Sequence, residues 1–121
     1  MQRDARAFLW DAHRAAEAVL GFTQGKSFDD FEQDILLRSA VERQFEIIGE
    51  ALSQLAKAHP KTAAKVPNLA KAVAFRNILI HGYAAIDRPT VWDVVQEKLP
   101  QLRDVLAALL QSGENSPDKP T

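Results

Sequence analysis

The chain has 121 residues and no cysteine, which excludes a disulfide framework, a thiolate metal site and a cysteine nucleophile. No apolar run approaches the length of a membrane-spanning helix, and the first residues lack the apolar centre of a signal peptide. We therefore expect a cytoplasmic protein without a membrane anchor. The three histidines are scattered and no pair is four residues apart, so no metal site is expected.

Acidic residues are missing from one long segment, although the net charge of the whole chain is only −1. None lies between Glu50 and Asp87, and the lysines of this segment are Lys57, Lys61, Lys65 and Lys71. A local excess of positive charge attracts phosphate groups, so these lysines are candidates for phosphate binding. The alternative is that they form an ordinary solvated face.

Apolar residues recur at helical spacing along most of the chain, and no stretch alternates as a half-buried strand would. The pattern predicts a first helix over residues 3–20 and a second element that Ser27 and Asp30 open as a capping pair. A long apolar stripe then predicts the core helix, which should end before His59 and Pro60.

The second half of the chain also follows the helical period. A short turn is expected before Pro67, followed by a helix over residues 68–81. Asp87 should cap a final helix that runs to about residue 110 and that Pro100 kinks or divides.

Four or five helices with short connections predict an all-α fold, an up-and-down bundle. With 46% hydrophobic residues, the chain suits a single domain over residues 1–110. Residues 111–121 hold one glycine and two prolines with almost nothing apolar, so we expect a tail without regular structure.

The most informative stretch is the octet at residues 76–83, which reads Arg-Asn-Ile-Leu-Ile-His-Gly-Tyr. Asn77 and His81 are four residues apart and therefore share one side of a helix, within reach of the Arg76 guanidinium. Gly82 suits the position just past a helix C-terminus, which would leave His81 on the last turn and Tyr83 outside it.

Arg76 projects into an apolar arc of the same predicted helix, where a charged side chain is unusual and calls for an explanation. The arc consists of Leu69, Ala72, Val73, Phe75, Leu79 and Ile80. A guanidinium in such a place must be paired, hydrated or in a cleft. Carboxylates on the long helix, Glu42, Glu46 or Glu50, could supply its partner.

The octet resembles the signature of the HEPN superfamily, an arginine and a polar residue followed after a short gap by a histidine. The tyrosine two positions after the histidine is similar to the narrower HepT family. Further likeness lies in the stretch at 40–51, in Val91-Trp92, and in Leu99-Pro100-Gln101-Leu102. The chain departs from the family at Pro67-Asn68-Leu69, where a tryptophan is common, so this loop should pack differently.

The resemblance implies a dimeric helical bundle that acts as the toxin of a HepT/MNT toxin-antitoxin pair and cleaves single-stranded RNA without a metal. Arg76, Asn77 and His81 would be its catalytic residues, in a groove at the dimer interface. The partner MNT nucleotidyltransferase would transfer AMP to Tyr83, and the bulky negative charge would then block RNA entry.

Simpler interpretations of the same residues remain open. His81 could only interact with the helix dipole, Tyr83 could only anchor the turn, and Trp92 is more typical of a packing residue than of a base-stacking one. At the level of function, the alternative is a non-enzymatic helical subunit that presents Tyr83 or a substrate to a nucleotidyltransferase.

Overall fold

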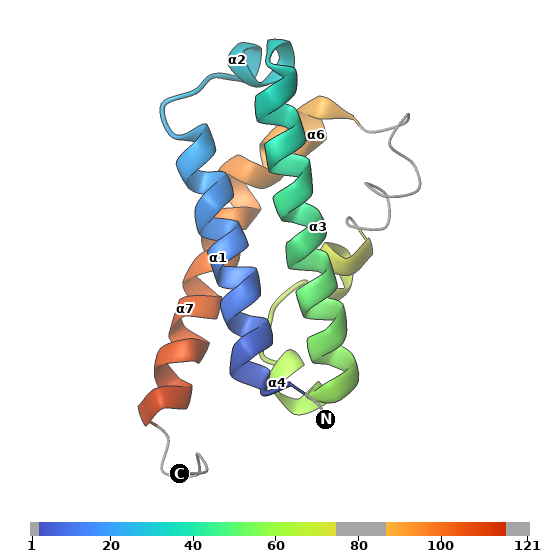
Figure 1. The fold of residues 1–121 in the computed structure, drawn as a ribbon, viewed down its shortest axis with the longest axis vertical. Helices are drawn as coiled ribbons and strands as arrows, with labels where there is room; N and C mark the ends of the chain where they lie inside the picture. Colours follow the sequence, from blue (N-terminus) through green and yellow to red (C-terminus); the bar gives the residue numbers. More distant parts are fainter. Residues whose placement is uncertain (1–2, 75–86, 116–121) are drawn as a thin grey trace.

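Every element of regular structure in the described part of the chain is a helix, which confirms the predicted all-α fold. The computed structural model describes residues 3–74 and 87–115, and Figure 1 shows them as a bundle with one long axis. Besides the helical residues 69–74, the elements are α1 (Ala5–Thr23), α2 (Phe28–Gln33), α3 (Ile35–Ala58), α4 (Pro60–Ala63), α6 (Arg88–Asp93), η2 (Val94–Lys98) and α7 (Leu99–Asn115).

The first helix, α1, begins and ends slightly later than the predicted range of 3–20. Its start is fixed by Asp4, whose carboxylate accepts a hydrogen bond from the backbone N–H of Arg6 at 2.9 Å. Near its end, the buried Thr23 hydroxyl donates to the backbone oxygen of Val19 at 2.8 Å, so this polar group is satisfied inside the core.

Two successive side-chain caps turn the chain from α2 into α3. The predicted capping pair is confirmed, because the Ser27 hydroxyl accepts from the Asp30 N–H and the Asp30 carboxylate accepts from the Ser27 N–H. Asp34 then caps α3 by accepting from the Leu37 N–H at 3.1 Å. The predicted end of α3 before His59 is also confirmed.

The last three elements form one continuous helical run with a change of pitch inside it. Asp87 is its N-cap and Pro89 lies in its first turn, as predicted, although the Asp87 carboxylate accepts from the Thr90 hydroxyl and not from a backbone N–H. The predicted break at Pro100 takes the form of the π-helical segment η2, where the Leu99 N–H bonds to the oxygen of Val94. Pro100 has no N–H for the ordinary helical bond, so a wider turn before it costs little.

The final helix α7 runs to Asn115, beyond the predicted end near residue 110. Residues 111–115, which the sequence analysis assigned to a tail, are therefore helical, and residues 116–121 lie outside the described ranges. The backbone hydrogen bonds of a helix can extend a turn or so past its last buried residue, here Leu110, so an apolar stripe marks the helix end only approximately.

The long helices are arranged up and down, with α1 between α3 and α7 (Figure 1). The chain runs up through α1, turns through α2, and descends through α3. α6 lies at the upper end of the bundle, near α2 and on the α3 side, and the chain then crosses to α7, which descends on the other side of α1. The most extensive packing in the described ranges is between α1 and α3, followed by α1 with α7. α1 is thus the helix that joins the two sides of the bundle.

The core lies along this central helix. Its completely buried side chains are Ala12, Ala16 and Val19 from α1, Val41, Leu52 and Leu55 from α3, and Leu106 from α7. The outward faces of the long helices are mostly polar, with a few exposed apolar side chains such as Trp10 and Leu36. Among residues 3–74 and 87–115, no helix has the length and apolar character needed to cross a bilayer.

We expect Leu52→Ala to lower the free energy of unfolding by about 2 to 5 kcal/mol, because the side chain is fully buried and leaves a cavity. Urea denaturation followed by circular dichroism measures this. The matched control is Leu36→Ala on the same helix, where 76% of the side chain is exposed and the change should stay within about 0.5 kcal/mol. Equal losses in the two variants would contradict this description of the core.

Candidate functional site

The four polar residues of the octet, Arg76, Asn77, His81 and Tyr83, lie outside the residues that the structure describes. What the structure does describe is the segment that leads into them. Residues 69–74 are helical, in agreement with the first half of the helix predicted over 68–81.

The segment that enters the octet is oriented by its apolar side. Leu69, Ala72 and Val73 are half-buried and pack against the core, so the first three residues of the predicted apolar arc face inward. Asn68 precedes them with φ of 59°, a left-handed conformation that asparagine tolerates better than most residues. The backbone oxygen of Asn68 accepts a hydrogen bond from the Ala72 N–H at 3.0 Å, which is the first bond of this helix.

The three carboxylates proposed as partners for Arg76 differ in their surroundings. Glu46 lies 3.9 Å from Arg43, and Glu50 accepts a hydrogen bond from the Gln54 amide at 3.0 Å. Burial raises the pKa of Glu42 above its ordinary value of 4.5; Glu46 adds to this effect, and Arg38 and Arg88 oppose it. Burial therefore disfavours the charged form of the Glu42 carboxyl group.

The four candidate lysines are all exposed, but they are not on one element. Lys57 lies in the last turn of α3 and Lys61 in α4, at the lower end of the bundle in Figure 1. Lys65 follows in the turn after α4, and Lys71 lies in the helical residues 69–74, higher along the bundle. The four lysines are thus spread from the end of the bundle to the helical residues 69–74, which precede the octet in the sequence.

Several polar and aromatic residues outside the octet have structural partners. The His59 ring nitrogen Nε2 lies 2.8 Å from the backbone oxygen of Arg3 and ties the start of the chain to the end of α3. Trp92 packs on Phe31, with ring centroids 5.2 Å apart, which supports its interpretation as a packing residue.

One exposed aromatic residue was missed by the sequence analysis. Trp10 lies on α1 with 51% of its surface accessible, next to His13, whose imidazole is stacked with the indole. The signal that could have found it is its position, since Trp10 falls outside the apolar stripe formed by Phe8, Leu9 and Ala12.

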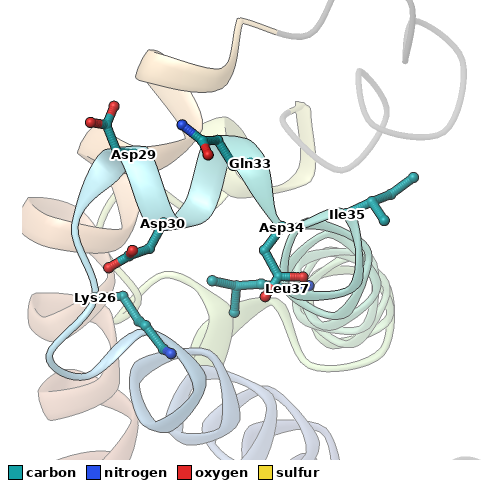
Figure 2. Close-up of a pocket in the computed structure, with 7 residues that line it drawn as sticks. All are labelled: Lys26, Asp29, Asp30, Gln33, Asp34, Ile35 and Leu37. Atoms are coloured by element: carbon teal, nitrogen blue, oxygen red, sulfur yellow. Dashed lines mark hydrogen bonds between the residues drawn. The ribbon is translucent and has the colours of Figure 1, made fainter.

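A hollow of about 400 Å³ lies at the corner between α2 and α3 (Figure 2). Asp29, Asp30 and Asp34 line it together with Lys26, so its lining would repel a phosphate group. The hydrogen bonds from Ser27 hold the pKa of Asp30 below its ordinary value, and Asp34 caps α3. Asp30 and Asp34 therefore stabilise the helix starts on this side of the bundle. No group of three or more histidine, aspartate or glutamate side chains in the described ranges is arranged to hold a metal ion.

Comparison with known proteins decides which family this bundle represents. Residues 12–109 match the family described as ribonuclease HepT-like. The chain belongs to the HepT-like family. The match extends from the middle of α1 to the last turns of α7 and includes the octet, which confirms the resemblance found in the sequence.

The alignments of this HepT-like protein with individual relatives cover nearly the whole length of those relatives. Two proteins of Methanocaldococcus jannaschii, each named as a candidate RNase, are 36% and 32% identical to it; the alignments cover 84% and 95% of this chain and 93% and 98% of the relatives. A Thermococcus cleftensis protein named "Probable ribonuclease HepT" is 32% identical, over 85% of this chain and 93% of its own. No solved structure matches significantly.

We expect Glu42→Gln to change how the stability of this HepT-like protein depends on pH. Because the pKa of Glu42 is raised in the folded state, the folded protein holds this proton more tightly than the unfolded chain does. The free energy of unfolding of the wild type should therefore fall, relative to that of Glu42→Gln, as pH rises from about 4.5 through the folded pKa. Urea denaturation of both proteins at several pH values measures the difference. A constant difference, or one of opposite sign, would show that burial does not control this carboxyl group.

Proposed function

We propose that this HepT-like protein is an endoribonuclease toxin that cleaves single-stranded RNA without a metal ion, in a groove shared by two copies of the chain. The observation that carries the proposal is the family match, because it spans the whole octet at residues 76–83. The relatives named as RNases, aligned over most of their length, support the same activity.

The reaction uses the 2′-hydroxyl of RNA as an internal nucleophile. A base removes the 2′-proton as the oxygen attacks phosphorus, the bond to the 5′-oxygen breaks, and an acid protonates that departing oxygen. The products are a 2′,3′-cyclic phosphate and a 5′-hydroxyl. His81 performs a proton transfer, since imidazole titrates near neutral pH. Arg76 holds two phosphate oxygens, and Asn77 orients His81 or the phosphate.

A second histidine is needed if one side chain is the base and another the acid. The two other histidines of the chain have partners elsewhere, His13 at Glu17 and His59 at the backbone of Arg3. A two-fold dimer that brings two octets face to face supplies both His81 side chains to one groove. This arrangement makes the dimer a requirement of the chemistry.

The exposed lysines between residues 57 and 71 extend the positive charge of this groove along the RNA backbone. Lys57, Lys61, Lys65 and Lys71 lie on surface positions of consecutive elements that lead toward the octet. Each phosphate contact releases condensed counterions, so binding weakens as salt rises.

An MNT-type nucleotidyltransferase silences the toxin through Tyr83. The phenolic oxygen attacks the α-phosphorus of ATP, a bond forms between them, the bond to pyrophosphate breaks, and the phenolic proton is lost. The AMP group carries negative charge beside Arg76 and His81, so it competes with the scissile phosphate.

We expect purified protein to cleave single-stranded RNA in the presence of EDTA, and His81→Ala and Arg76→Ala to reduce the cleavage rate by at least about 100-fold each, through lost proton transfer and lost phosphate binding. Gel electrophoresis of a labelled oligonucleotide measures the rate.

The matched control for the arginine is Arg43→Ala, an exposed side chain on α3 that should leave the rate unchanged. Circular dichroism checks that each variant is folded. If wild type and His81→Ala cleave equally, or neither cleaves, the protein acts as a non-enzymatic subunit and the nuclease proposal is wrong.

Co-expression with a cognate MNT-type nucleotidyltransferase should add one AMP group to wild-type protein, detected by intact-mass spectrometry, and relieve growth inhibition. Tyr83→Phe should carry no added mass and stay toxic, because phenylalanine lacks the acceptor oxygen. Arg76→Ala serves as the non-toxic control. An AMP group on another residue, or a Tyr83→Phe protein that is still silenced, would exclude this regulation.

A further inference from the structure

Trp10 is an exposed aromatic side chain that neither the core nor the family match explains. It lies on α1 with 51% of its surface accessible, whereas the other tryptophan, Trp92, is half-buried against Phe31. It also lies just outside residues 12–109, the range that matches the HepT-like family. A tryptophan left half in water forgoes much of the stabilisation that its burial would give.

One side of the Trp10 indole is supported by other residues. The His13 ring is stacked with it at an angle of 25°, with centroids 6.3 Å apart. His13 Nε2 lies 3.6 Å from the Glu17 carboxylate, and Arg103 of α7 approaches the same carboxylate at 3.9 Å. The imidazole therefore neighbours both the indole and the Glu17 carboxylate, and about half of the Trp10 surface stays open to solvent.

Positive charge flanks the indole along the helix. Arg6 and Arg14 lie one turn before and one turn after Trp10, each within about 40° of it around the helix axis. Arg6 donates to the backbone oxygen of Leu110, which keeps its guanidinium on this side of α1. Arg14 is exposed, and no carboxylate in the described ranges pairs with it.

The acidic groups of this surface do not cancel that charge. Asp11, one turn before Arg14, pairs with Arg3 at 2.9 Å. Glu17 lies near both His13 and Arg103, and Asp104 pairs with the Arg103 guanidinium at 2.9 Å. Arg14 is therefore available to bind a phosphate group from solution, beside an aromatic face that can accept a base.

We infer that Trp10 and Arg14 form a second contact for single-stranded RNA, made by residues that do not belong to the octet. The indole stacks on one base and the guanidinium binds a phosphate of the same strand, a combination that accepts any base. This inference rests on the proposed function, because it adds a contact for the same class of substrate. It gives the protein a longer footprint on RNA than the cleavage groove alone.

A protein partner fits this surface less well than RNA does. Protein interfaces have an apolar centre, and here the helix positions one turn from Trp10 carry two arginines, a histidine and only one small apolar residue, Ala7. The other large apolar side chains exposed in the described ranges are Phe22, Ile35 and Leu36, at the end of α1 and the start of α3. Those positions are at the far end of α1, near α2 (Figure 1).

The test is a fluorescence titration of Trp92→Phe protein, in which Trp10 is the single tryptophan. The probe is a 2′-O-methylated oligouridylate of about 12 nucleotides, which binds like RNA but cannot be cleaved at its 2′-oxygen. Stacking should quench Trp10 emission in a saturable way. In the otherwise wild-type chain, Trp10→Ala and Arg14→Ala should each weaken binding of the same probe, labelled with a dye, by roughly tenfold.

Phe22→Ala is the matched control, since it removes an exposed aromatic from the same helix, about 120° away around the axis. Its affinity for the probe should equal that of the wild type. Unquenched Trp10, or equal affinity in Trp10→Ala and wild type, would overturn the inference even if the protein cleaves RNA. A Trp10→Ala protein that loses only its complex with a nucleotidyltransferase would also overturn it, in favour of a protein contact. Trp10-dependent binding without any RNA cleavage would support it while rejecting the nuclease proposal.

Discussion

The close packing of α1 against α3 is the constraint on which the rest of the structure depends. Ala12 and Ala16 are completely buried at the centre of the bundle, and side chains of this size let the neighbouring helices approach closely. Because α1 also packs on α7, it holds together two sides of the fold that are distant in sequence. The hydrogen bond of His59 to the backbone of Arg3 fixes the two helix ends relative to each other. The lysine-bearing segment and the helical residues 69–74 follow that end of the bundle along the chain.

The same packing links the two surfaces to which we assign function. Leu69, Ala72 and Val73 attach the helix that enters the octet to the common core, so this helix starts in a fixed place and direction. The opposite, outward side of α1 presents Trp10 and Arg14. A bundle of this kind offers a small protein two polar faces on one rigid support, which suits a long, charged substrate better than a single small pocket does.

Much of the fold could be predicted from the sequence because its determinants are local. The apolar stripe with helical period, the Ser27 and Asp30 capping pair, and the break at His59 act within a few residues. Pro100 predicted an interruption, but its π-helical form depends on the wider turn that the lost hydrogen bond allows. The helical residues 111–115 were missed because a stripe of apolar residues ends before backbone hydrogen bonding does. Trp10 was missed because it lies outside the apolar stripe of α1. The spread of the lysines over several elements could not be predicted, because residues that are close in sequence need not share one surface.

We propose that the 2′-hydroxyl of RNA is the nucleophile and that Arg76 and His81 act on the phosphate and the proton. The most direct measurement uses two oligonucleotides that differ by a single 2′-deoxy substitution at the cleavage position, with mass spectrometry of the products in EDTA. We expect a 2′,3′-cyclic phosphate and a 5′-hydroxyl from the all-ribose strand, and no cleavage at the substituted position. Cleavage at the deoxy position, or products with a 5′-phosphate and a 3′-hydroxyl, would contradict it.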